Sequence, residues 1–270
     1  MKLPYVLRLA DDALILSQRL GEWTGHGPIL EQDIALTNAA LDHIGRARSL
    51  YQYAADLFNS LPQDEKSKAF TSVALQQIVS SGAPLTEDNL AYLRDGWDFR
   101  NVLLAERANI DWAYTVARNF FLDAFHYFYF TALVKCSDTT LSAIAEKSLK
   151  EVTYHLKWSS EWVIRLGDGT DESHSKMQEA IDETWPYTGE LFQPSDYETA
   201  MQQEIGAPGL DAVRSQWIER VNAILTEATL NVPKEAWMHR GGKEGIHSEE
   251  LGYMLAEMQY MQRTYPGMEW

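Results

Sequence analysis

The chain has 270 residues, of which 45% are hydrophobic, and it carries a formal net charge of −16. This length suits one large domain with a sizeable core, and the acidity argues against nucleic-acid binding because phosphates would be repelled. Cys136 is the only cysteine, which excludes an internal disulfide and a cysteine-ligated zinc or iron–sulfur site. No signal-peptide pattern and no run of about 20 apolar residues occurs, so we expect a cytoplasmic protein without a membrane span.

Apolar residues recur at helical spacing from the start of the chain. The pattern predicts a first helix over about 4–23, a break at Thr24-Gly25-His26-Gly27, and a second, long helix over about 28–59. We expect five apolar residues to form the buried stripe of the second helix: Leu30, Ile34, Leu41, Ile44 and Tyr51.

Residues 60–108 are less regular, with a short helix expected over about 66–79 and another capped by Thr86. The segment 109–135 is so rich in aromatic residues that it is apolar on nearly every side, which places it at the centre of a bundle. A turn with N-cap chemistry then leads into a helix over about 139–166, which two glycines end.

The remaining sequence predicts further helices over about 173–191, 211–230 and 248–263, with a kink at Pro186. The four long helices before residue 167 form two short-loop hairpins joined by a connection of about 50 residues, which is the ferritin-like arrangement. We therefore predict an all-α, ferritin-like four-helix bundle as a single domain, 1–270. Its core spans about 4–166, and additional C-terminal helices form an extension over about 171–270.

A ferritin-like dimetal protein places a Glu on each of two helices and a Glu-x-x-His on each of the other two. In the second hairpin, Asp123 and Val152 lie about equally far from the turn near Ser137, so the two residues should be level. Asp123 is a carboxylate within the most apolar helix, which is unfavourable unless it is paired. The expected Glu-x-x-His here reads Val152-x-x-His155, with the glutamate replaced.

The first hairpin offers an equally incomplete set. Asp42 stands mid-helix, but the residue three positions later is Gly45, and His43 has the wrong offset for the motif. The first helix offers Gln18, a neutral amide in place of a carboxylate, with Asp11 and Asp12 as alternatives nearer its start.

The number of possible metal ligands is therefore smaller than the four carboxylates and two imidazoles of an intact site. Asp42, Asp123 and His155 remain, and Glu151 should point elsewhere because one residue turns a helix by about 100°. We predict no metal in this chain. The alternative to decayed ligands is a set of satisfied core polar groups, in which Gln18, Asp42, Asp123 and His155 hydrogen-bond to one another.

Several sequence runs resemble the structural-subunit family (PaaC type) of the phenylacetyl-CoA epoxidase complex. The resemblance spans nearly the whole chain and includes stretches with no chemical necessity. The runs that carry it are Ser17-Gln18-Arg19-Leu20-Gly21-Glu22-Trp23, Lys150-Glu151-x-x-Tyr154-His155-Leu156, Arg165-Leu166-Gly167-Asp168-Gly169-Thr170-Asp171, Thr188-Gly189-Glu190-Leu191-Phe192 and Ala228-Thr229-Leu230-Asn231-Val232-Pro233.

The resemblance implies a place in aerobic phenylacetate degradation. In that family a sister subunit of the same fold holds the di-iron centre and epoxidises phenylacetyl-CoA, using O2 and electrons from an NADPH-dependent flavin and iron–sulfur reductase. The subunit resembled here is a non-catalytic structural partner of that catalytic subunit. The resemblance implies Gln18, Asp42, Gly45, Asp123, Val152 and His155 as the degenerate di-iron positions, and a homodimer is expected for the isolated chain.

Two other functions remain open from the sequence. One is an active dimetal carboxylate oxidase with atypical ligands that recruits Glu151 or Asp12. The other is a helical bundle that binds CoA esters, for which Arg240 and Lys243, beside two glycines, are candidate contacts to a phosphate or a partner. The alternative for this glycine-rich stretch is a loop folded onto the bundle.

Overall fold

The structure is a computed structural model that describes residues 1–234 and 237–268. The described part is helical and contains no strand. Four long helices dominate it: α1 (Lys2–Glu22), α2 (Leu30–Asn59), α7 (Trp112–Leu133) and α8 (Thr139–Gly167). They confirm the four long helices predicted from apolar spacing.

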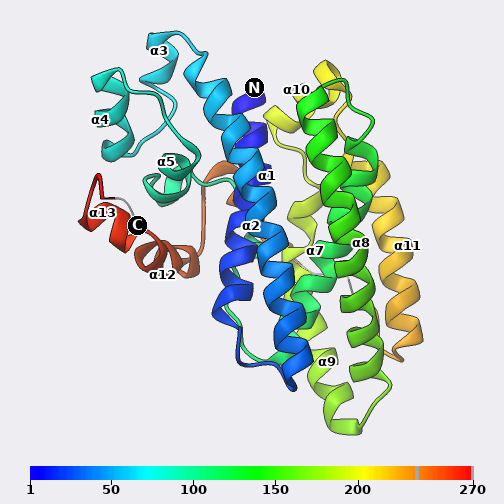
Figure 1. Cartoon of the computed structure of the whole chain (residues 1–270). Helices are drawn as coiled ribbons and strands as arrows, with labels where there is room; N and C mark the ends of the chain where they lie inside the picture. The colour runs from blue at the N-terminus through cyan, green and yellow to red at the C-terminus, as the bar shows by residue number, and fades with distance from the viewer. Residues whose placement is uncertain (235–236, 269–270) are drawn as a thin grey trace.

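The long helices form two hairpins, α1 with α2 and α7 with α8, and the hairpins meet through α2 and α8 (Figure 1). Shorter helices occupy the connection between the hairpins: α3 (Gln63–Lys66), α4 (Val73–Ser81), α5 (Glu87–Tyr92), the 3-10 turn η1 (Gly96–Asp98) and α6 (Leu103–Glu106). Thr86 caps α5 as predicted, its side chain accepting the Asn89 amide in a reciprocal capping box. This is the all-α, ferritin-like bundle expected from two hairpins and one long crossover.

The C-terminal third wraps the bundle on both sides. Its elements are α9 (Asp171–Thr184), η2 (Trp185–Tyr187), η3 (Gly189–Phe192), α10 (Asp196–Ile205), α11 (Leu210–Glu227), η4 (Gly242–Glu244), α12 (Glu249–Met258) and α13 (Tyr260–Thr264). Helices α9 and α11 pack on the second hairpin, whereas α12 and α13 lie beside α5 on the opposite side (Figure 1).

Helix α7 is buried over most of its length, as its apolar composition predicts. Trp217 of α11 shows how the outer helix is fixed on it: the indole is 2% exposed, lies against Phe121 and donates from Nε1 to the Phe121 carbonyl at 2.9 Å. A buried indole needs such an acceptor for its N–H, so this contact sets both the position and the rotation of α11.

The stripe predicted to be buried on α2 is wrong in its first half. Leu30, Ile34 and Leu41 are 69%, 52% and 61% exposed, although Tyr51 is buried. The face of α2 that packs inward instead carries small and polar residues beside the apolar ones, namely Leu36, Ala40, His43, Arg46, Ala47, Leu50, Tyr51, Ala54, Ala55 and Phe58. Apolar spacing identified the helix but not the side that faces the core.

Two further expectations are corrected in the C-terminal third. Pro186 does not kink one long helix: α9 ends at Thr184 and 3-10 turns follow, because a proline lacks the N–H that continues an α-helix. Helix α10 was not predicted, although the sequence holds its start signal. Ser195 and Glu198 form a reciprocal capping box there.

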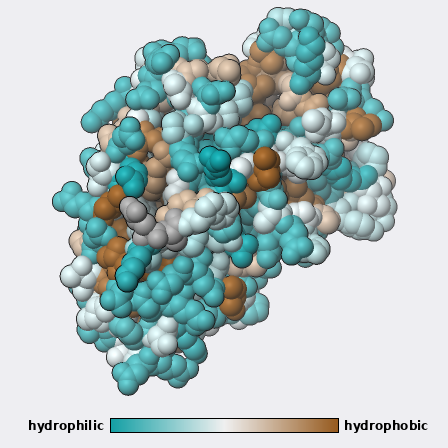
Figure 2. Space-filling model, turned by 180° about the vertical axis from the view of Figure 1, so that it is seen from behind, coloured by the Kyte–Doolittle hydropathy of each residue, from teal (hydrophilic) through white to brown (hydrophobic). Residues whose placement is uncertain are grey.

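Over residues 1–234 and 237–268, no helix combines the length and apolarity that crossing a bilayer requires. The face opposite to the view of Figure 1 is largely hydrophilic, with hydrophobic residues in separate patches (Figure 2).

Candidate functional site

Three side chains from three long helices meet inside the bundle. They are His43 of α2, Asp123 of α7 and His155 of α8, and their ligand atoms all lie within 4.8 Å of one another. The exposed fractions are 1%, 2% and 3%, so the cluster is fully interior. Asp123 and His155 come together as the residue count from the hairpin turn predicts.

His43 is the member that the sequence interpretation rejected. It lies three residues after Ala40, so the inner face of α2 reads Ala40-x-x-His43, in parallel with Val152-x-x-His155 on α8. Ala40 is also level with α1, because the Ser17 hydroxyl donates to the Ala40 carbonyl at 3.0 Å. Both imidazoles of the ferritin-like pattern are therefore present, and each glutamate is replaced by an apolar residue.

This register corrects the assignment of Asp42 and Gly45 to the motif. Asp42 is at the rim, with a side chain 38% exposed, and its Oδ2 accepts from His155 Nε2 at 3.0 Å. A side chain on Gly45 would have nothing closer than Lys147 Nζ at 3.9 Å, so position 45 does not face the interior cluster. Asp42 therefore orients His155 from outside the cluster.

The bond to Asp42 fixes the proton of His155. A carboxylate only accepts, so Nε2 carries hydrogen, and in the neutral form of the ring Nδ1 has the free lone pair. That Nδ1 is buried and has no hydrogen-bond partner among the described residues. His155 thus retains the orientation of a metal ligand held by an outer carboxylate.

Arg46, one turn after His43, closes the other side of the cluster. Its Nη2 lies 2.6 Å from His43 Nδ1, its guanidinium packs 5.1 Å from the ring centre of Phe130, and the residue is 3% exposed. Guanidinium nitrogens only donate, so His43 Nδ1 is the acceptor and the proton of the neutral ring sits on Nε2.

Burial governs the ionisation of this interior. It raises the pKa of Asp123 to about 6, against a smaller lowering effect of His155, Ser159 and Arg46. Burial, with the nearby Arg46 charge, holds the pKa of His43 and of His126 well below the usual range, so both rings are neutral. Burial lowers the pKa of Arg46 to about 10, which leaves it charged at neutral pH.

The other predicted residues add no further carboxylate or imidazole to the cluster among the described residues. Val152 is fully buried, and Gln18 is half-buried with no hydrogen bond to the cluster in the part of the chain described. Glu151 pairs with Lys147 at 3.6 Å, although it also faces the charge of Arg46. Asp12 accepts from the Val102 amide and lies beside Arg8, where burial raises its pKa.

The glycine-rich stretch does not form a phosphate site with Lys243. The ammonium is 1% exposed and donates to Glu198 Oε2 at 3.0 Å and to the Gln193 carbonyl at 2.9 Å. Arg240 is exposed, but it does not share a surface with the buried lysine. The loop is folded onto the bundle, so the expected contact between Lys243 and a phosphate or partner is not supported.

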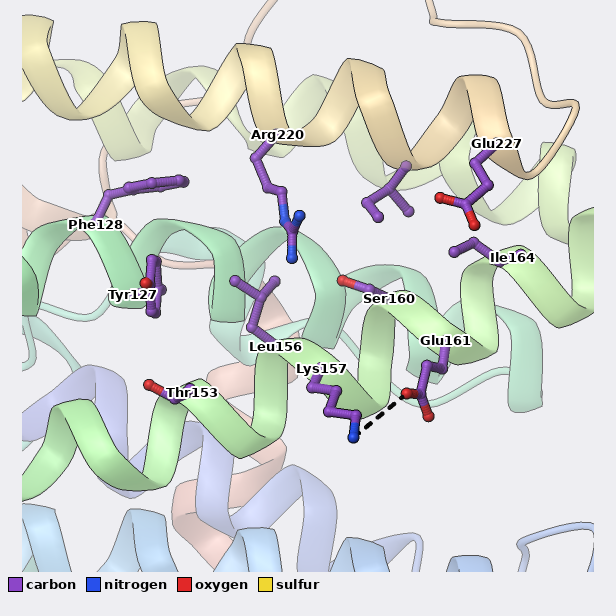
Figure 3. Close-up of a pocket in the computed structure, with 11 residues that line it drawn as sticks. Tyr127, Phe128, Thr153, Leu156, Lys157, Ser160, Glu161, Ile164, Arg220 and Glu227 are labelled. Atoms are coloured by element: carbon purple, nitrogen blue, oxygen red, sulfur yellow. Dashed lines mark ion pairs between the residues drawn. The ribbon is translucent and has the colours of Figure 1, made fainter.

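A surface groove of about 620 Å³ runs between α7, α8 and α11, with Arg220 reaching from α11 toward the hairpin (Figure 3). Its charged residues are two cations, Lys157 and Arg220, and two acids, Glu161 and Glu227, with Lys157 and Glu161 paired at 3.9 Å. The charges cancel, so the groove offers no net attraction to the phosphates of a CoA ester.

A di-iron centre does not fit these residues. Hard iron ions need mostly carboxylate oxygens, and Asp123 is the sole carboxylate of the cluster within the described residues. The Ala40 and Val152 positions supply no donor, and the acceptor nitrogen of His43 is taken by Arg46. The chain therefore belongs to the class of all-helical, ferritin-like bundles, and its interior cluster holds two histidines and one carboxylate.

Comparison with known proteins agrees with this class. The model of a family described as phenylacetic acid catabolic protein matches residues 1–270, and the chain belongs to this family. A relative from Escherichia coli (strain K12), one of the subunits of the 1,2-phenylacetyl-CoA epoxidase, is 45% identical over 266 residues, which cover 98% of each chain.

Proposed function

We propose that this chain is a non-catalytic structural subunit of a phenylacetyl-CoA 1,2-epoxidase complex in aerobic phenylacetate degradation. In this proposal a catalytic subunit of the same fold holds the di-iron centre, a separate reductase carries flavin and an iron–sulfur cluster, and this chain has no cofactor. The replacement of both motif glutamates, by Ala40 and Val152, carries the proposal because two imidazoles and one carboxylate do not bind two irons.

An exposed apolar row on α2 supports the pairing role. Leu30, Ile34 and Leu41 lie within about 40° of one another around the helix and are all more than half exposed. Tyr154 of α8 is also 54% exposed. It is the sequence neighbour of His155, which contacts Asp42, the sequence neighbour of Leu41. An exposed row of large apolar side chains along a long helix is typical of a protein–protein interface.

Co-purification tests the pairing. The chain is expressed with a tagged catalytic subunit of the family, and retention is compared between the wild type and Ile34→Glu/Leu41→Glu. We expect the variant to lose the partner while its own melting temperature is unchanged, since both side chains are exposed. Val73→Glu is the matched control, because Val73 is 65% exposed on the distant helix α4.

An activity assay tests the structural role. Epoxide formation from phenylacetyl-CoA is measured with the reductase and NADPH, using the catalytic subunit alone and with this chain. We expect full activity to require this chain and to survive His155→Ala within it. Loss of turnover in the His155→Ala complex, with assembly intact, would overturn the non-catalytic assignment.

A further inference from the structure

Arg46 has a role that the decay of a metal site does not by itself explain. Three potential ligands still converge, and the Nδ1 of His155 is buried without a hydrogen-bond partner among the described residues. Two imidazoles and one carboxylate are a sufficient set for a single divalent ion with open positions. The three residues could therefore bind one metal ion if a single feature did not prevent it.

The feature that prevents metal binding is the hydrogen bond to His43. Its Nδ1 lone pair accepts a hydrogen bond from Arg46, and its Nε2 therefore carries the proton of the neutral ring. A metal ion needs a deprotonated ring nitrogen, so neither nitrogen is available. Moving the proton to Nδ1 would set an N–H against the guanidinium, donor against donor, in an interior where polar groups need partners.

The guanidinium also brings a fixed positive charge to the edge of the cluster, beside His43. Glu151, Asp123 and Asp42 are the acids that most stabilise the charged form of Arg46. Phe130 covers the guanidinium on another side and holds it in place. A cation fixed to the chain therefore compensates the interior carboxylate that a bound ion would otherwise neutralise.

We propose that Arg46 is a built-in cation that takes the place of the metal and, by fixing the tautomer of His43, keeps the His43–Asp123–His155 cluster from binding divalent ions. The proposal concerns the interior of this chain alone and stands whether or not the chain assembles with a catalytic subunit. It predicts that removing the guanidinium converts a closed cluster into a metal site.

The test is Co²⁺ binding to full-length Arg46→Met, followed by visible absorbance and by metal analysis after gel filtration. Methionine keeps an unbranched chain over the Phe130 ring but has no donor. We expect about one Co²⁺ per chain in the variant and none in the wild type, with binding lost in Arg46→Met/His155→Ala. Arg48→Met is the matched control, because the Arg48 side chain is 72% exposed on the same helix.

Stability provides a second readout. We expect Arg46→Met to melt below the wild type in chelator and to recover when Co²⁺ is added, because a ligand that binds the folded state raises its melting temperature. Stoichiometric, His43-dependent Co²⁺ binding by the wild type would overturn the proposal. So would a folded Arg46→Met chain that binds no Co²⁺.

Nitrogen NMR of the wild type keeps the proposal testable if Arg46→Met does not fold. The imidazole ¹⁵N shifts at neutral pH distinguish the two neutral tautomers. We expect His43 to be protonated at Nε2 with an accepting Nδ1. A proton on His43 Nδ1 would contradict the proposal that Arg46 fixes the tautomer.

Discussion

Asp123 offers a direct test of the energetics inside the bundle. Burial raises the pKa of this carboxyl from 3.8 to about 6. Because the folded-state pKa is the higher one, the folded state binds the proton more tightly than the unfolded state does. Ionisation of Asp123 therefore costs stability, and the cost grows as the pH rises between about 4 and 6.

The magnitude follows from the shift. A difference of about two pH units, at about 1.4 kcal/mol per unit, corresponds to about 3 kcal/mol of stability lost by the wild type between pH 4 and pH 7. Asp123→Asn has nearly the same shape and does not ionise. We expect it to match the wild type near pH 4 and to exceed it by up to about 3 kcal/mol at pH 7.

Urea denaturation at pH 4, 5, 6, 7 and 8 measures this difference, with both proteins unfolded under the same conditions. The buried neutral histidines destabilise both proteins alike at acid pH, so the difference isolates Asp123. Asp56→Asn, on the exposed side of α2, is the control and should change stability by less than about 0.5 kcal/mol. A difference that is flat with pH, or an Asp123→Asn variant less stable at pH 7, would refute the reasoning.

Three further predictions concern other parts of the chain. Gly242→Ala should lose about 1–3 kcal/mol of unfolding free energy in urea, because its Cβ would lie 2.3 Å from the Asn101 carbonyl oxygen. Gly45→Ala should gain about 0.5–1 kcal/mol, because its Cβ would lie on a helix at an ordinary contact distance of 3.9 Å from Lys147 Nζ. Lys243→Met should lose about 3 kcal/mol, because it removes the nearer of the two cations beside the buried Glu198 carboxylate and leaves only Arg8, at 3.7 Å. The exposed Arg240→Met should melt like the wild type. Burial opposes the charged form of His247, but hydrogen-bond acceptors at both ring nitrogens, Glu106 and the Phe99 carbonyl, outweigh it and raise the pKa. The stability lost in His247→Gln should therefore be greatest below pH 6.5 and should shrink as the pH rises. An NMR titration that shows no raised pKa for His247 would contradict this.

The sequence was sufficient for most of the architecture because helices are specified locally. Apolar spacing and caps predicted all four long helices, and the loop lengths predicted their pairing into two hairpins. The errors fall where local signals conflict: Pro186 ends a helix that the spacing would continue, and α10 has a clear capping box but little apolar pattern.

The site was predictable along one hairpin and not across two. Asp123 and His155 belong to adjacent antiparallel helices, so counting residues from the turn brings them together. His43 depends on how α2 is rotated, and the apolar residues Leu30, Ile34 and Leu41 suggested the wrong inner face. A row of apolar residues on the surface of a helix has the same spacing as a row that faces the core, so spacing does not distinguish the two.

The amino-acid sequence by itself therefore determined the all-α class and the two hairpins, because these follow from spacing and residue type. Tertiary structure alone decided that His43 joins the cluster, that Arg46 occupies its acceptor nitrogen and that Lys243 is buried against Glu198. Which lone pair meets which donor depends on helix rotation to within a few degrees and on distances of tenths of an ångström. Those quantities are set by the packing of all the helices together.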